Sequence, residues 1–222
     1  MRLSLRALEL CCTKFGKGSF YGFEQTGESA LNGITEEDAA KDFDELLQNG
    51  IISVMGDDIH ISALGHHIFN MMITPEQCII LDNETIGICV RIYIRNAYYL
   101  CVMENKNIES TDSYDRYIFD LLPRLDMIVG AFVYILHNTK NSEKQNVRII
   151  GKAWDEERNV ISEFTAEDVI CQSGTACCNI DEESNGTKKE TEKFEDEVSA
   201  LINKLTMWMF GNISAIYEKE AS

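Results

Sequence analysis

The sequence is poor in positive charge. Its 222 residues include 20 Lys and Arg against 37 Asp and Glu, which gives a formal net charge of −17 at pH 7. Affinity for nucleic acid rests largely on cationic side chains that neutralise phosphates, and anionic membrane surfaces attract the same side chains. The composition therefore argues against a nucleic-acid or membrane-surface partner. It is compatible with a basic protein partner, although an acidic surface solvated by water alone is the simpler interpretation.

Long apolar runs and a secretion leader are missing as well. The longest apolar run, residues 127–136, is about half the length that a helix needs to span a bilayer. The leucine-rich start of the chain is interrupted by Arg6 and Glu9, and no small-residue cleavage site follows it. We therefore expect a soluble cytoplasmic protein that does not insert into a membrane.

The sequence also lacks the common motifs of catalysis and metal binding. It contains no glycine-rich phosphate loop, nucleophile elbow or dinucleotide fingerprint. His66 and His67 adjoin, so in a helix their side chains point about 100° apart; a zinc site from His60, His66 and an acid stays an alternative. The cysteines form no CxxC pair and lie mostly among apolar neighbours, which favours buried reduced thiols. We expect a non-enzymatic protein with no catalytic residue, no metal and no cofactor.

Residues 34–72 predict a helix, a short hairpin and a second helix. Thr35 and Ser62 are placed to cap the two helices, and Gly56-Asp57-Asp58 separates two short β-rich runs. This order is the outline of a winged helix, a shape often used to read DNA. Eight acidic residues and a single lysine lie in this stretch, however, where a DNA reader needs cations. We therefore expect a winged-helix-like unit within residues 1–78 that does not bind DNA.

Residues 85–95 give the clearest strand. Every even-numbered position is Ile or Val, whereas the odd-numbered positions include polar and aromatic residues. This period-two alternation predicts one buried face and one available face. Asn96-Ala97 is a plausible turn into a second strand over 98–103, although Ala suits such a turn less well than Gly.

The rest of the chain completes an α+β fold. We expect a central antiparallel sheet flanked by helices, with residues 79–222 supplying β hairpins, packing helices and a long C-terminal helix. Together with residues 1–78 they form one compact globule. The expected elements are a strand over 116–121, a helix opened by Leu122-Pro123, a hairpin over 147–164, a mobile loop over 173–193 and a helix from Glu195 to about Tyr217.

The candidate binding residues lie mainly on the odd face of the 85–95 strand. Arg91, Tyr93 and Arg95 are of the residue types enriched at protein interfaces, and they form a cationic spot in an acidic protein. Tyr98 and Trp154 complete the set, although a tryptophan is more often a core residue. In the alternative interpretation, a helix covers this face and the arginines pair with nearby acids. If this face is instead available to a partner, replacing Tyr93 by Ala together with Arg91 by Glu abolishes partner capture and leaves the fold intact.

Four stretches in order carry a family resemblance: DELLQNGIISVMGDDIHISALGHHIFNMMITPE, GICVRIYIRNAYYLCVMEN, YIFDLLPRLDMIVGAF and VRIIGKAWDEERNVISEF. As a pattern of element types with few identities, they resemble the EspG-type chaperones of type VII (ESX) secretion and their firmicute relatives. The resemblance implies a central antiparallel sheet with flanking helical units in a pseudo-twofold arrangement. It also implies a cytoplasmic chaperone or adaptor that binds the apolar tip of a helical-hairpin secretion substrate. No binding residue is carried over.

Two other classes of function remain open. One is a transcriptional regulator whose winged helix acts through protein contacts or binds DNA weakly. The other is a small-molecule sensor or an enzyme with a pocket under the sheet, where Tyr98, Tyr99 and His60 would gather. A deep polar pocket in the structure favours this second class, whereas a flat sheet face argues against it.

Overall fold

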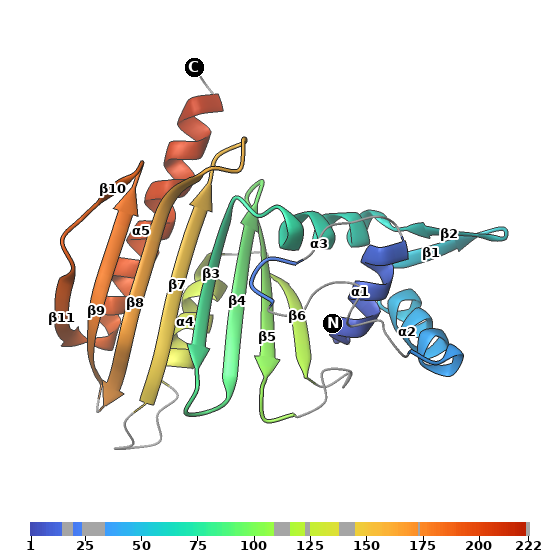
Figure 1. The fold of residues 1–222 in the computed structure, drawn as a ribbon, viewed down its shortest axis with the longest axis horizontal. Helices are drawn as coiled ribbons and strands as arrows, with labels where there is room; N and C mark the ends of the chain where they lie inside the picture. Colours follow the sequence, from blue (N-terminus) through green and yellow to red (C-terminus); the bar gives the residue numbers. More distant parts are fainter. Residues whose placement is uncertain are drawn as a thin grey trace.

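The computed structural model describes residues 1–14, 20–23, 34–108, 116–122, 125–137, 145–172 and 174–220 (Figure 1). The helices are α1 (Leu5–Lys14), α2 (Glu36–Gln48), α3 (Ala63–Ile73), α4 (Leu125–His137) and α5 (Val198–Glu220). The strands are β1 (Ile52–Met55), β2 (Asp58–Ile61), β3 (Gln77–Asn83), β4 (Ile88–Arg95), β5 (Tyr98–Asn105), β6 (Tyr117–Leu122), β7 (Gln145–Trp154), β8 (Val160–Gln172), β9 (Thr175–Ser184), β10 (Thr187–Lys188) and β11 (Glu192–Glu197).

A large antiparallel sheet organises the molecule. Its strand order is β10-β9-β8-β7-β3-β4-β5-β6, and β11 also pairs with β9. The β1–β2 hairpin is separate and projects away from the sheet, beyond α3 (Figure 1). The expected α+β class with a central antiparallel sheet flanked by helices is confirmed.

α4 and α5 lie side by side on one face of the sheet, the far side in Figure 1. α4 packs on β3, β4 and β6, and α5 packs on β8, β9 and β11. The side chains between helices and sheet form the first hydrophobic core. Its members include Ile79, Leu81, Val90, Ile92, Phe132, Leu136, Val147, Phe164, Leu201, Leu205 and Met209.

The N-terminal part covers the opposite face over β4, β5 and β6. α1, α3 and residues 20–23 pack there in a second hydrophobic core. This core includes Leu3, Leu8, Phe20, Phe69, Met72, Cys78, Tyr93, Leu100, Val102, Phe119 and Trp154. Phe20 stacks on Phe69 of α3 with 6.1 Å between ring centroids, which fixes residues 20–23 to the helical unit.

Local sequence signals explain the helix–hairpin–helix order of α2, β1, β2 and α3. The Thr35 hydroxyl accepts a hydrogen bond from the Asp38 amide at 3.1 Å, and the Ser62 hydroxyl accepts one from the Gly65 amide at 2.9 Å. Both predicted caps are therefore confirmed. Gly65 has a further reason to be glycine, because a Cβ there would lie 2.2 Å from the Ile51 carbonyl oxygen. That these elements form a winged-helix unit stays a prediction.

The hairpins are confirmed as well. Asn96 and Ala97 both take positive φ, 49° and 57°, as a two-residue turn of type I′ requires, and Arg95 pairs with Tyr98. β7 pairs with β8 as expected over 147–164. The helix expected after Leu122-Pro123 is α4, while Pro123 itself lies outside the described residues.

The mobile loop expected over 173–193 is wrong for the described part of that range. Residues from Thr175 onward form β9 and β10 and begin β11. The small residues that suggested a loop belong to a strand with one buried face. Every second residue of β9 from Ala176, namely Ala176, Cys178 and Ile180, is buried in the first core. The last helix therefore begins at Val198, after β11, and not at Glu195.

The expected boundary between residues 78 and 79 falls inside β3. The second core also joins residues from both sides of this boundary. All eight cysteines are described; none is paired in a disulfide, and six of them are buried. Burial raises the pKa of the Cys11 thiol to about 12 and that of Cys89 to about 11. These thiols are therefore protonated and unreactive at neutral pH.

Within the described residues, no helix combines the length and the apolarity that crossing a bilayer requires.

Candidate functional site

The odd face of β4, expected to be available, lies under residues 20–23. Tyr93 is fully buried, and its hydroxyl donates to the Tyr21 carbonyl at 2.7 Å. Arg91 is 7% exposed, and its Nε donates to the Gly22 carbonyl at 2.8 Å. The Phe23 ring lies against the same guanidinium, 4.3 Å from centroid to Cζ. The expectation of an available face is therefore wrong at Arg91 and Tyr93, because a distant part of the chain crosses it.

The other three candidate residues have different surroundings. Arg95 is half-buried and donates through its guanidinium to the carbonyl and the hydroxyl of Thr74. Trp154 is buried edge-on against the Tyr21 ring, with 4.7 Å between centroids. Tyr98 is 58% exposed and packs edge-to-face on His67 at 4.5 Å. The structure thus gathers Tyr93 and Trp154 around Tyr21 and leaves Tyr98 at the surface; their role in partner binding stays a prediction.

A buried ionic cluster lies beside this covered face. Glu104 of β5 accepts hydrogen bonds from Arg91 at 2.8 Å and from Arg116 at 2.7 Å, one on each carboxylate oxygen. The Tyr117 hydroxyl also donates to Glu104, at 3.3 Å. Desolvation by burial raises the pKa of this carboxyl, but the two guanidinium groups outweigh it and hold the pKa below its ordinary value. Glu104 is therefore ionised at neutral pH. This arrangement matches the alternative in which the arginines pair with acids.

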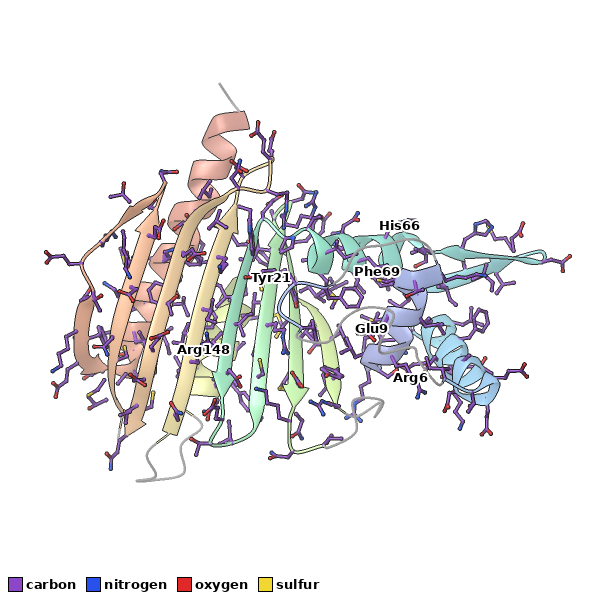
Figure 2. The ribbon with its side chains drawn as sticks, in the orientation of Figure 1. Arg6, Glu9, Tyr21, His66, Phe69 and Arg148 are labelled. Carbon is purple, nitrogen blue, oxygen red and sulfur yellow. The ribbon has the colours of Figure 1, made fainter. Side chains whose placement is uncertain are left out.

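A cavity of about 520 Å³ opens next to this cluster. The register of the sheet places Arg148 of β7 opposite Asp82 of β3, and Asp82 opposite Cys89, which in turn faces Glu104. Figure 2 shows Arg148 on β7, below Tyr21 in that view. The cavity is lined by the apolar Leu5, Phe23, Ile80 and Ile150, by the ionic Asp82, Arg91, Glu104, Lys106, Arg116 and Arg148, and by Gly22, Cys89 and Tyr117.

The polar pocket contains none of the residues suggested for it from the sequence. Tyr98 and Tyr99 are consecutive on β5 and so point to opposite faces of the sheet. His60 lies on the projecting hairpin, exposed. The ionic cavity draws instead on residues from β3, β4, β5, β6 and β7, and no local sequence signal brings these together.

The exposed side of α4 is apolar. The sequence of α4, LDMIVGAFVYILH, holds a single acidic residue and no lysine or arginine. Its inner residues are in the core, yet Met127 and Tyr134 are each 46% exposed. We call the exposed apolar residues of these two touching helices the helix-layer surface: Met127, Val133 and Tyr134 of α4, with Met207 and Phe210 of α5.

Met207 is 74% exposed and borders a hollow of about 720 Å³ between α5 and strands β9 and β11. Phe194 and Trp208 supply part of its wall, while Glu183 and Glu192 lie at its polar side. The sequence contained a signal for this surface. The apolar run 127–136 is too short for a membrane helix and apolar on every side, a pattern typical of a helix with no solvent-facing side.

Comparison of the sequence with protein-family models finds no matching family, and comparison with curated proteins finds no matching relative. The function is therefore inferred from the residues and contacts described above.

Proposed function

We propose that this protein is a non-enzymatic binding protein that receives an amphipathic helix of a partner protein on the helix-layer surface. One observation carries the proposal: α4 is apolar on all sides, but only its inner side is covered. A helix of this composition is ordinarily buried, and exposed apolar patches mark sites of interaction. A partner helix laid along α4 and α5 completes that burial.

The chemistry of the surface defines the partner. Helix-in-groove recognition uses apolar anchors at i, i+3, i+4 and i+7, and the hollow beside Met207 has room for one such anchor. Acids outnumber cations around this hollow, with Glu182, Glu183 and Glu192 against Lys189 and Lys204, and the protein has a net charge of −17. The partner helix therefore carries lysine or arginine beside its apolar stripe, because opposite charges at the rim accelerate association and orient the complex.

The more specific proposal is a cytoplasmic chaperone or adaptor for a helical-hairpin substrate of type VII secretion. Its support is the resemblance of four stretches of the sequence to the EspG-type chaperones, together with an exposed apolar surface suited to a helix. We place the partner contact on the helix-layer surface and not on the face of β4 that the sequence suggested, because residues 20–23 cover Arg91 and Tyr93.

Site-specific crosslinking in the native cell tests the proposal. A photoreactive amino acid replaces Tyr134 or Met207, and matched controls carry it at the exposed Met55 of the β1–β2 hairpin or at Tyr98. We expect a helical protein, of the WxG or LxG type in the more specific proposal, to crosslink from positions 134 and 207 and not from the controls. Crosslinks between two copies of this chain from position 134, or partner crosslinks from position 55 alone, contradict the proposal.

A further inference from the structure

The ionic cavity on the sheet concentrates positive charge in an acidic protein. Arg91, Lys106, Arg116 and Arg148 line it, against the carboxylates of Asp82 and Glu104. Glu104 is shared between Arg91 and Arg116, and Lys106 pairs with Asp82 through Nζ and Oδ2 at 2.6 Å. The cations therefore outnumber the acids, although acids outnumber cations in the chain as a whole.

Two polar groups in this cavity lack a partner. Within the described part of the chain, the Arg148 guanidinium has neither a hydrogen bond nor an ion pair, and the buried Oδ1 of Asp82 accepts no hydrogen bond. Buried acceptors are nearly always satisfied, and a guanidinium presents five donors. Because Asp82 and Arg148 are opposite each other in the β3–β7 register, a single small ligand can reach both.

The neighbouring row of the sheet supplies an apolar wall. Ile80 and Ile150 are opposite each other, one step along from Asp82 and Arg148 on the same face. Phe23 covers the cavity from the N-terminal side. A ligand that fits this arrangement has an anionic group for Arg148, a hydrogen-bond donor for Asp82 Oδ1, and a short carbon chain between them.

We propose that this cavity binds a small organic anion that carries a hydroxyl group, either a hydroxycarboxylate or a hydroxyalkyl phosphate. The anion pairs with the Arg148 guanidinium, and the ligand hydroxyl donates to Asp82 Oδ1. This site is separate from the helix-layer surface, which lies on the opposite face of the sheet.

Isothermal titration calorimetry at low ionic strength tests the proposal with four probes: L-malate, succinate, glycerol 3-phosphate and inorganic phosphate. Malate and succinate differ by one hydroxyl group, and glycerol 3-phosphate and phosphate differ by the hydroxyl-bearing chain. We expect malate to bind about tenfold more tightly than succinate, or glycerol 3-phosphate about tenfold more tightly than inorganic phosphate, since the second probe of each pair lacks the alcohol hydroxyl that reaches Asp82 from the carbon chain. Binding of malate assigns the anionic group as a carboxylate, and binding of glycerol 3-phosphate assigns it as a phosphate. Equal binding within both pairs, or no heat from any probe up to about 10 mM, overturns the proposal.

A pair of variants of the full chain locates the binding. Arg148→Gln removes the unpaired cation, and Lys152→Gln removes a cation from the same face of β7 that pairs with Glu163 and does not line the cavity. We expect Arg148→Gln to weaken binding at least about tenfold and Lys152→Gln to leave it unchanged. Equal losses in both variants indicate general charge attraction and overturn the site. Urea unfolding without ligand checks that both variants are folded, as the exposure of Arg148 leads us to expect.

Discussion

Arg91 of β4 and Glu104 of β5 form a buried ion pair, with 2.8 Å between Nη1 and Oε2. Arg116 binds the other oxygen of the same carboxylate at 2.7 Å. The three side chains hold β4, β5 and β6 together on the face that residues 20–23 cover. Arg91, which the sequence suggested as an interface residue, is therefore buried, and it stabilises the attachment of the N-terminal part to the sheet.

Glu104→Gln should destabilise the protein strongly. It removes the negative charge that Arg91 and Arg116 share in a buried site, and breaking such a cluster costs about 3–5 kcal/mol. The matched control is Glu163→Gln, because Glu163 pairs with Lys152 near the surface of the same sheet, where a pair contributes about 1 kcal/mol or less. Urea unfolding followed by circular dichroism measures both. Similar losses in the two variants contradict a special role for Glu104.

Lowering the pH should reduce the free energy of unfolding, because Glu104 becomes protonated. The pKa of Glu104 is lowered in the folded protein from its ordinary value of 4.5. Its contribution is therefore fully present above pH 4.5 and is lost as the pH falls below that value through the folded pKa. The free energy of unfolding, measured between about pH 6 and pH 3, should fall less steeply in Glu104→Gln than in the wild type. Parallel curves contradict this prediction.

Tyr93→Ala combined with Arg91→Glu should unfold the protein and not merely remove a contact surface. Tyr93 is fully buried, and deleting a buried aromatic side chain costs about 3–5 kcal/mol. The second change places a carboxylate beside Glu104 in a buried site, which adds to the loss. Tyr98→Ala is the control, since Tyr98 is mostly exposed. A double variant with the wild-type melting temperature would show that the face of β4 is open in solution.

Gly151→Ala should loosen α5 from the sheet. A Cβ at position 151 of β7 would lie 2.7 Å from the ring of Trp208, whose Nε1 donates to Ser162 at 2.9 Å. Overpacking of this kind costs about 1–3 kcal/mol. Gly211→Ala on α5 meets no atom within 4 Å and should stabilise the helix by about 1 kcal/mol. Thermal unfolding with tryptophan fluorescence compares them, and a stabilised Gly151→Ala contradicts the packing of Trp208.

Local interactions could be predicted from the sequence, and contacts between distant residues could not. The caps at Thr35 and Ser62 and the turn at Asn96-Ala97 depend on neighbours within a few residues, so their residue types predict them. The alternation in β4 correctly identifies one buried face, but it holds no information about a segment about 70 residues upstream that covers the other. In β9 the small residues of a buried strand resembled those of a loop, because only α5 makes that face interior.

The candidate site follows the same rule. The ionic cavity combines Asp82, Lys106, Arg116 and Arg148, whose proximity arises only from the strand order β7-β3-β4-β5-β6. The helix-layer surface was accessible from the sequence in part, since the run 127–136 is apolar on every side. Which side stays uncovered depends on the packing of α4 against the sheet and α5.

The affinity of the captured partner for variants of the helix-layer surface tests the central claim most directly. Val133→Ser with Tyr134→Ser removes two exposed apolar side chains from α4, and Val54→Ser with Met55→Ser removes two from the projecting hairpin as a matched control. Because apolar and aromatic anchors carry most of the binding energy at interfaces, we expect the α4 variant to bind the partner at least about thirtyfold more weakly, and the hairpin variant to bind like the wild type. Unchanged affinity in the α4 variant, with its fold intact, would contradict binding through the helix layer.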